Sequence, residues 1–348
     1  MIKIKIQNPI KHRNEITFRP FLQLKNVLRE YSIDITESDD YDFLFVGMAD
    51  FIDKSKSLHD SINYGLDNLD KISGDYFLFD GSDSTSLMGA YEVFEQSNAT
   101  YLFKNQILKN KDMYKNSYAF GKWFFNSESD LDLSYDISSE NWNKIKLTNI
   151  NCGRTIFGTG VTNYLNQLQP VLKDKSIDIC AIFQGNHGEC YDHKVRNDIP
   201  YTEHRKGLWE KLDTIKNKYL TIADKLPFQE YVEKLAKSKI CLSPFGMGEL
   251  CFRDFESIMM GTIMLKPNQS NVITTPNIYV EGETYIGCKL DWSDVGEKID
   301  FIMSNFRELN DKITYNARKM MTEQYTDENF GLHYYDIFSN LESIQSDG

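Results

Sequence analysis

The residues with the clearest capacity for chemistry lie in one stretch, Ser238 to Pro267, which reads SKICLSPFGMGELCFRDFESIMMGTIMLKP. A loop containing Gly246, Met247 and Gly248 comes directly before a helical pattern over residues 250–260. The start of a helix presents unpaired backbone N–H groups and the positive end of the helix dipole. The sequence therefore predicts that this loop binds a phosphate or a diphosphate.

Two charged residues inside the predicted helix add to this chemistry. Arg253 can donate a fork of hydrogen bonds to phosphate oxygens, and Glu256 can accept hydrogen bonds from a pair of sugar hydroxyls. Together they favour a nucleotide as the ligand. The alternative is that the two residues form an i, i+3 ion pair, which stabilises a helix by only roughly 0.2–0.5 kcal/mol.

The same stretch contains the elements that must hold these residues. Residues 240–243 form a short apolar run of strand length, which Pro244 and the two glycines end. Apolar positions at i, i+3 and i+7 then mark one buried helix face, and Gly261 ends that helix. Residues 262–265 resume a strand pattern, so the stretch predicts a strand–helix–strand unit.

The rest of the chain also alternates strand and helix patterns. In the first half we expect strands at 2–6, 41–46, 76–79 and 100–108, and helices at 18–31, 60–69 and 88–96. In the second half we expect strands at 177–183 and 219–223, and helices at 161–168, 202–215, 228–236, 295–321 and 330–341. Residues 126–151, rich in Ser, Asp and Asn, are expected to form a long loop.

This alternation predicts an α/β fold with two Rossmann-like domains, each built on a mainly parallel sheet. We expect an N-terminal domain over 1–150, a C-terminal domain over 151–325, and a C-terminal helix over 326–348 that crosses back to the N-terminal domain. Ligands of such sheets bind at the carboxyl ends of the strands.

Composition limits the class of protein. The 348 residues carry a net charge of −12, which argues against a general nucleic-acid binder. No apolar run is long enough to span a bilayer, and Met1 to Gln7 alternates like a strand rather than a signal peptide. The six cysteines make no CxxC pair and are expected to be reduced. We therefore expect a cytoplasmic protein.

One segment departs from the acidic average. Between Tyr101 and Phe125, lysines and aromatic residues interleave against one acid, Asp112; they are Lys104, Lys109, Lys111, Lys115, Lys122, Tyr114, Tyr118, Phe120 and Trp123. Such a patch can contact an anionic or planar partner. The alternative is a strand and loop with solvated lysines.

The stretch from Ser238 to Pro267 resembles the donor-binding region of GT-B nucleotide-sugar glycosyltransferases, particularly the exostosin-like and related group. The similar pattern is a strand, SPFGMG, then FRDFE, a glycine and an apolar strand, and the preceding LPFQEYVEKLAKSKICLSP at Leu226 to Pro244 is similar too. The likeness covers about thirty residues closely. It implies two Rossmann-like domains facing across a cleft, with a nucleotide-sugar donor on the C-terminal domain and an acceptor on the N-terminal one.

The resemblance also implies roles for single residues. The Gly246–Gly248 loop and Arg253 would contact the donor diphosphate, and Glu256 would bind the donor ribose. Glu249 would lie near the transferred sugar, with a helix cap as the alternative. Phe228 would lie beside the nucleotide base, with an ordinary core position as the alternative.

Other candidates come from position in the chain. His187 follows the predicted strand at 177–183, and Arg205 is nearby in the sequence, so both are candidates for binding the donor phosphates. His187 is equally interpretable as a loop histidine. Asp80 and Asp83, in DGSD after a predicted strand, are candidates for a general base or for acceptor binding, or simply for an Asp-Gly turn. His187, Cys190 and His193 have a metal-like rhythm without a fourth ligand, so we expect no metal and no cofactor.

These observations together predict a metal-independent glycosyltransferase, hexosyl or pentosyl, that moves a sugar from a nucleoside-diphosphate sugar to a hydroxyl acceptor such as a glycan. Two alternatives remain at this point. The first is a glycosyltransferase acting on hydroxylated bases of phage-type DNA through the Lys104 to Lys122 patch. The second is a noncatalytic nucleotide- or glycan-binding protein with the same fold.

Overall fold

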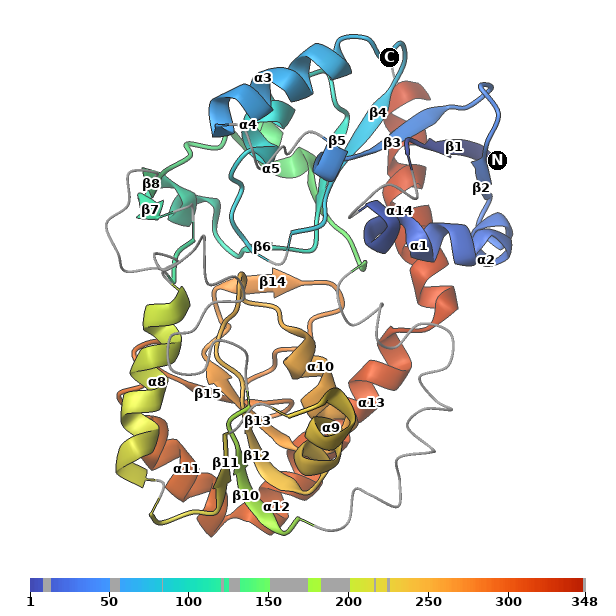
Figure 1. Cartoon of the computed structure of the whole chain (residues 1–348). Coiled ribbons are helices and arrows are strands. Elements are labelled where there is room, and N and C mark those ends of the chain that lie inside the picture. The colour runs from blue at the N-terminus through green and yellow to red at the C-terminus, as the bar shows by residue number, and fades with distance from the viewer. Residues whose placement is uncertain are drawn as a thin grey trace.

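The computed structural model describes residues 1–8, 14–50, 57–82, 84–119, 122–124, 132–150, 175–182, 201–215, 217–223 and 226–346. Within them the chain forms two parallel sheets, one above the other in Figure 1. The predicted α/β fold with two Rossmann-like domains, the GT-B class, is confirmed. The predicted boundary near residue 150 lies next to a stretch outside the described residues, so the domain bounds stay a prediction.

The N-terminal domain has a six-stranded parallel sheet in the order β2-β1-β3-β4-β5-β9. Its strands are β1 (Ile2–Ile6), β2 (Ile33–Thr36), β3 (Phe43–Gly47), β4 (Tyr76–Asp80), β5 (Tyr101–Lys104) and β9 (Ile145–Leu147). Its helices are α1 (Asn14–Gln23), α2 (Lys25–Glu30), α3 (Leu58–Leu69), α4 (Ala90–Glu95) and α5 (Ser139–Lys144), with 3-10 turns η1 (Met48–Asp50) and η2 (Lys111–Lys115). A short hairpin pairs β7 (Tyr118–Ala119) with β8 (Asp132–Leu133).

The C-terminal domain has a five-stranded parallel sheet in the order β11-β10-β12-β13-β15. Its strands are β10 (Ile177–Cys180), β11 (Thr221–Ile222), β12 (Ser238–Leu242), β13 (Ile263–Pro267) and β15 (Ile286–Cys288). Its helices are α8 (Tyr201–Ile215), α9 (Phe228–Ala236), α10 (Phe252–Met259), α11 (Val295–Ser304), α12 (Phe306–Leu309) and α13 (Tyr315–Gln324), with a π-helical turn η5 (Asn310–Thr314) between the last two.

Both sheets follow one topological plan. Counted along the chain within each domain, the first five strands of each sheet lie in the order 2-1-3-4-5. In this order the chain changes direction between the first and third strands, and the crevice at their carboxyl ends is where such folds bind ligands. In the C-terminal domain that crevice lies between β10 and β12.

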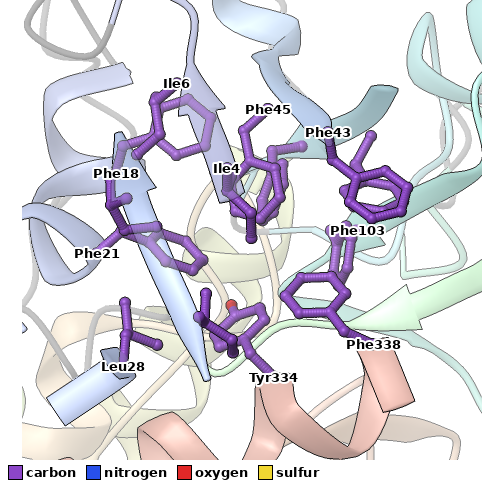
Figure 2. Close-up of a cluster of buried hydrophobic side chains, with 14 of the residues drawn as sticks. Ile4, Ile6, Phe18, Phe21, Leu28, Phe43, Phe45, Phe103, Tyr334 and Phe338 are labelled. Carbon is purple, nitrogen blue, oxygen red and sulfur yellow. The ribbon is translucent and has the colours of Figure 1, made fainter. Parts of the chain in front are cut away.

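Side-chain alternation builds a core on each face of the N-terminal sheet. Strand residues such as Phe45, Phe79 and Phe103 point to one face, and Val46 and Leu78 point to the other. The first face, called the aromatic face below, is rich in aromatic side chains that pack among isoleucines and leucines (Figure 2), and Phe79 and Phe103 stack with ring centroids 4.5 Å apart.

The last helix, α14 (Asp327–Ser346), belongs to the N-terminal core although the C-terminal domain precedes it in the chain. Phe330, Tyr334, Phe338 and Leu341 are buried against the aromatic face. Figure 1 shows this red helix beside β1 and α1, which confirms the predicted return of the C-terminal helix.

A short strand pair also joins the two domains. Strand β6 (Gln106–Leu108) follows β5, leaves the N-terminal sheet and pairs antiparallel with β14 (Val272–Thr274) from the C-terminal domain. The single strand expected over 100–108 is therefore two strands that belong to different sheets, because the strand is interrupted at Asn105.

Three other expectations differ from the structure. The long loop expected over 126–151 contains α5 and β9, and β9 closes the edge of the sheet. The long helix expected over 295–321 is broken into α11, α12, η5 and α13. Strands β2, β14 and β15 were not expected; β2 has four residues and β14 and β15 have three each, which is too short for a periodic pattern to identify them securely. The helix expected over 161–168 lies outside the described residues.

Candidate functional site

The glycine loop lies where the strand–helix–strand prediction puts it, between β12 and α10. Helix α10 begins at Phe252, and the side chain of Asp254 accepts a hydrogen bond from the backbone N–H of Cys251 at 3.0 Å. This carboxylate caps the helix start. The loop closes on itself through a hydrogen bond from the Gly246 N–H to the Gly248 carbonyl at 3.0 Å.

Arg253 lies at the carboxyl ends of β10 and β12. Its Nε donates to the carbonyl of Ile182, just after β10, at 3.3 Å. Its Nη1 donates to the carbonyl of Pro244, just after β12, at 3.2 Å. The guanidinium therefore spans the carboxyl ends of the two strands between which the sheet changes direction, and this is the ligand-binding position of the fold.

Arg205 supports the loop from helix α8. Its side chain is buried and its Nε donates to the Phe245 carbonyl at 2.9 Å. A Cβ atom added at Gly246 would lie 3.3 Å from an Arg205 Nη atom and 3.6 Å from the Cys251 sulfur. A side chain at position 246 would therefore require the Arg205 guanidinium to shift by a few tenths of an ångström.

Glu256 is partly buried and accepts a hydrogen bond from the Tyr231 hydroxyl at 2.7 Å. Burial raises the pKa of Glu256, while the Tyr231 hydrogen bond and the charge of Arg253 oppose that rise. Burial also raises the pKa of Tyr231, so this hydroxyl remains a donor near neutral pH. One carboxylate oxygen of Glu256 is thus oriented by α9.

Phe228 is the first residue of α9 and is not a core residue, because 68% of it is exposed. Its ring lies 6.3 Å from the ring of Tyr231. Met247, at the tip of the glycine loop, and Phe252, at the start of α10, are also exposed. These exposed apolar side chains come from the start of α9, the glycine loop and the start of α10.

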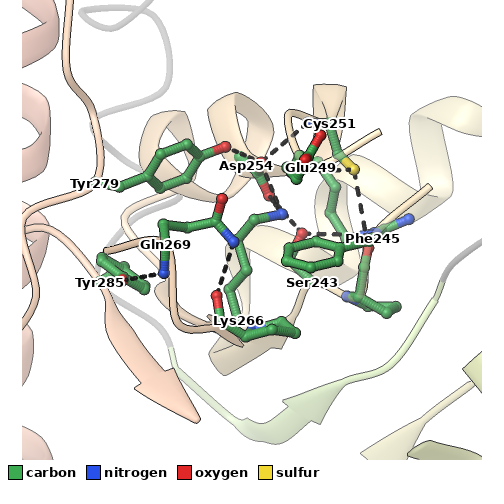
Figure 3. A network of polar contacts seen from close by, with 12 residues as sticks. Ser243, Phe245, Glu249, Cys251, Asp254, Lys266, Gln269, Tyr279 and Tyr285 are labelled. Atoms are coloured by element: carbon green, nitrogen blue, oxygen red, sulfur yellow. Dashed lines mark hydrogen bonds and ion pairs between the residues drawn. The ribbon is translucent and has the colours of Figure 1, made fainter. Parts of the chain in front are cut away.

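A buried polar network stabilises the loop from below (Figure 3). Asp254 is fully buried and its carboxylate contacts Ser243 Oγ at 2.5 Å, Tyr279 Oη at 2.5 Å and Lys266 Nζ at 3.1 Å. The Lys266 ammonium also lies 4.9 Å from the centre of the Phe245 ring. These contacts tie the end of β12, the start of α10 and strand β13 together.

The network residues were not among the sequence candidates. The sequence offered a signal for Lys266. This lysine lies between the apolar strand run 262–265 and Pro267, so its charge must find a buried partner. Asp254 sits at the third helical position, where acids cap helices. Tyr231 had no local signal, because its pairing with Glu256 depends on how α9 packs beside α10.

Glu249 is placed differently from the expectation. It is fully buried, and its carboxylate accepts hydrogen bonds from the N–H and Oγ1 of Thr85, from Gln106 Nε2 and from Trp123 Nε1. A carboxylate with these partners and no exposed surface does not reach a sugar in this arrangement. The structure thus places Glu249 in a joint between the domains, and it does not support a catalytic role.

Asp80 ends strand β4 and is buried beside Lys104, whose Nζ lies 2.5 Å from one carboxylate oxygen. The other carboxylate oxygen accepts the Ser82 N–H at 2.9 Å. The carboxylate therefore forms an ion pair with Lys104 and a hydrogen bond within a turn. This corresponds to the Asp-Gly turn, the alternative given for the DGSD motif. Asp83 and His187 lie outside the described residues, as do Cys190 and His193.

The basic segment is not one exposed surface. Lys104 and Lys122 are buried, the first beside Asp80 and the second donating to the Met247 carbonyl. Lys115 lies 3.2 Å from carboxylate oxygens of both Asp112 and Asp136. Tertiary structure thus disperses the patch, because lysines near in sequence point to different partners.

Comparison with known proteins bears on the fold. No family model matches the chain, and no curated protein sequence matches it. Among solved structures, a sucrose-phosphate synthase from Thermosynechococcus elongatus is similar over 99% of this chain and 100% of its own, at 10% identity and a TM-score of 0.52. This likeness is one of fold.

Two further solved structures are similar with lower TM-scores. Anabaena HepE in complex with UDP-glucose matches 98% of this chain and 100% of its own, at 9% identity and a TM-score of 0.48. An alpha-glucosyltransferase in complex with UDP-glucose and DNA containing an abasic site matches 97% and 99%, at 13% identity and a TM-score of 0.46.

The described residues contain no group of three or more His, Cys, Asp or Glu side chains arranged to hold a metal ion. Cys180, Cys241, Cys251 and Cys288 are free thiols, and the other two cysteines lie outside the described residues. Among the described helices, none is long and apolar enough to cross a membrane.

Proposed function

We propose that this protein is a glycosyltransferase that moves a hexosyl or pentosyl group from a nucleoside-diphosphate sugar to a hydroxyl acceptor. The observation that supports this most is the position of Arg253, which bridges the carboxyl ends of β10 and β12 beside the glycine loop. An anion in that crevice would meet the guanidinium and the start of α10 together.

In this proposal the donor lies along the C-terminal domain. The Gly246–Gly248 loop and Arg253 hold the diphosphate, and Arg205 supports the loop from behind. Glu256, oriented by Tyr231, accepts hydrogen bonds from the ribose hydroxyls. The exposed ring of Phe228 lies one helical turn from Tyr231 and offers a face to the base.

The reaction breaks the bond between the anomeric carbon and the diphosphate oxygen and forms one to the acceptor oxygen, which loses its proton. Negative charge develops on the leaving diphosphate. Preorganised positive groups stabilise such charge most effectively because they need no rearrangement during the reaction. We assign no general base, since Asp80 is held by Lys104 and Ser82 and Asp83 and His187 lie outside the described residues.

The proposal is tested by thermal shift with UDP, GDP, ADP, CDP and TDP. A ligand that binds the native state at 100 times its dissociation constant stabilises it by about 2.7 kcal/mol, so the correct diphosphate should raise the melting temperature by several degrees. If none of the five raises it, the donor site does not exist and the proposal is wrong.

Charge at the site also predicts metal independence. Because Arg253 and the helix start already supply positive charge, sugar transfer should proceed unchanged in EDTA. The measurement is donor turnover, with the diphosphate product counted, with and without chelator, with Mg²⁺ added back as the control. Loss of turnover in EDTA that Mg²⁺ restores would contradict this part of the proposal.

The acceptor is proposed to be a glycan or another glycoconjugate rather than DNA. The segment that suggested DNA places Lys104 and Lys122 in the interior. The noncatalytic alternative is decided by the same turnover assay, because binding of a donor without transfer or hydrolysis would favour it. The narrower assignment to the exostosin-like group, and a cytoplasmic location, rest on sequence and remain part of this proposal.

A further inference from the structure

The joint between the domains is centred on Glu249, the residue that directly follows the glycine loop. Its two carboxylate oxygens each accept two hydrogen bonds. Oε1 accepts from Thr85 Oγ1 at 2.5 Å and from Trp123 Nε1 at 2.7 Å. Oε2 accepts from the Thr85 N–H at 3.0 Å and from Gln106 Nε2 at 3.3 Å. All four donors belong to the N-terminal half of the chain.

Further contacts surround this carboxylate. The Lys122 ammonium group donates a hydrogen bond to the Met247 carbonyl at the tip of the loop. Strand β6, which carries Gln106, pairs with β14, and the Lys109 N–H donates to the Asn271 carbonyl at 2.8 Å. The ring of Phe124 packs on the ring of Phe245 with centroids 4.8 Å apart. The N-terminal half thus contacts residues 245, 247 and 249, which enclose both glycines.

Burial makes these hydrogen bonds obligatory. A carboxylate removed from water costs several kcal/mol unless its oxygens are fully hydrogen-bonded. Glu249 has no exposed surface, so the carboxylate is stable in this position only while Thr85, Gln106 and Trp123 supply their donors. The side chain at the end of the loop is consequently held by the N-terminal domain, in addition to the contacts that the loop makes within its own domain.

We propose that Glu249 is a positioning residue, through which the N-terminal domain holds the Gly246–Gly248 loop in the shape that binds the donor diphosphate. This inference rests on the proposed function, because it takes the loop to be the diphosphate site. It goes beyond that function by making donor affinity depend on Thr85, Gln106 and Trp123, three residues of the acceptor-side domain. Acceptor-domain residues and donor site are then coupled by a direct contact.

The test uses a matched pair of variants at Thr85. Thr85→Val keeps the shape of the side chain and removes the hydroxyl donor, whereas Thr85→Ser keeps the donor. Calorimetry measures the affinity for whichever of the five nucleoside diphosphates stabilises the natural chain most, at a temperature well below the unfolding midpoint of every variant. We expect Thr85→Val to weaken binding about tenfold or more, and Thr85→Ser to stay within about twofold.

The outcomes separate this inference from the proposed function. If the natural chain binds a diphosphate and folded Thr85→Val binds it equally well, the positioning role is wrong and the proposed function stands. If the natural chain binds none of the diphosphates, the proposed function fails and this inference falls with it. If Thr85→Val does not fold, Trp123→Phe replaces it, because that change removes the Nε1 donor and keeps an aromatic ring; unchanged affinity in it would overturn the inference.

Discussion

Glu256 shows how one hydrogen bond changes the meaning of a sequence pattern. Its spacing from Arg253 also allowed a simple surface ion pair, yet the structure directs its carboxylate to Tyr231 on another helix. The Arg253 guanidinium reaches the ends of β10 and β12. Each side chain is therefore oriented by a partner outside α10, which is what a binding site requires and a surface ion pair does not.

A residue-scale prediction concerns Glu256→Gln. Burial raises the pKa of Glu256, so its ionised form costs stability, and this cost appears as the pH rises through the raised pKa. Removing the charge should leave the melting temperature at pH 7 unchanged or higher. Donor binding should weaken about tenfold, because a hydrogen bond to a charged acceptor contributes roughly 1.5–3 kcal/mol.

The measurements for Glu256→Gln are thermal unfolding and calorimetry on the same samples. In the natural chain, donor affinity should also fall as the pH drops through the raised pKa of Glu256, at a higher pH than an ordinary glutamate would give, and the variant should lack this step. Glu230→Gln, an exposed acid on α9, is the control. Unchanged donor affinity in Glu256→Gln would remove Glu256 from the ribose site.

At the scale of elements, the strand–loop–helix unit depends on Asp254. This one carboxylate contacts Ser243, the residue after β12, the start of α10 through the Cys251 N–H, and β13 through Lys266. The turn between strand and helix is irregular backbone, which needs partners for its polar groups. Asp254 supplies the partner of the Cys251 N–H from a position with no access to water, and the carbonyls of Pro244 and Phe245 accept from Arg253 and Arg205.

An element-scale prediction follows for Asp254→Asn. The change leaves the Lys266 ammonium buried without a compensating charge, and breaking a buried ion pair on one side costs about 3–5 kcal/mol. We expect the free energy of unfolding of the C-terminal domain to fall by about this amount, as measured by urea denaturation with fluorescence.

The control is the double variant Asp254→Asn with Lys266→Met, which removes the stranded charge as well. It should be more stable than Asp254→Asn alone, because a well-packed neutral replacement of an ion pair is often tolerated. Additive losses in the double variant would show that the pair is not energetically coupled.

At the scale of the whole molecule, the chain crosses between domains more than once. The N-terminal sheet comes first in the chain and the C-terminal sheet second, and strands β6 and β14 pair between the two domains. The chain then returns to the N-terminal core at its end through α14. The hydroxyls of Thr148, just after β9, and Tyr334, on α14, are 2.6 Å apart. The last helix is therefore part of the N-terminal fold, and the two domains are not two separate, consecutive segments of the chain.

The corresponding prediction compares two phenylalanines. Phe338 on α14 is 1% exposed within the aromatic face, whereas Phe301 on α11 is 50% exposed. Phe338→Ala should lower the free energy of unfolding of the N-terminal domain by about 3–5 kcal/mol through the cavity it leaves. Phe301→Ala should change stability by less than about 1 kcal/mol.

Chemical denaturation of both variants and of the natural chain is the measurement. Because Phe338 lies far along the chain from β1, a large loss specific to N-terminal unfolding would demonstrate that α14 completes that domain. Equal and small losses in both variants would contradict the packing seen in Figure 2.

The local elements and the class of fold could be predicted from the sequence. Apolar runs of strand length alternated with helical stripes, and that pattern depends only on which face of each element must avoid water. The loop around Gly246 was also legible, because proline and glycine end a strand and the apolar spacing restarts as a helix. The sequence did not predict the order of the strands, because pairing partners are distant in the chain. It also did not predict the short strands β2, β14 and β15 or the interruption at Asn105.

The contacts between side chains that are distant in the chain could not be predicted and depend on the packing of the two domains. Glu249 and Thr85 are 164 residues apart in the chain, and nothing near either one indicates the other. The lysines of the basic segment were predicted to form one surface patch, whereas Lys104 and Lys122 are buried in the structure. The physical reason is the same in each case: a buried charge is tolerable only beside its partner, and the fold, not the local sequence, brings that partner to it.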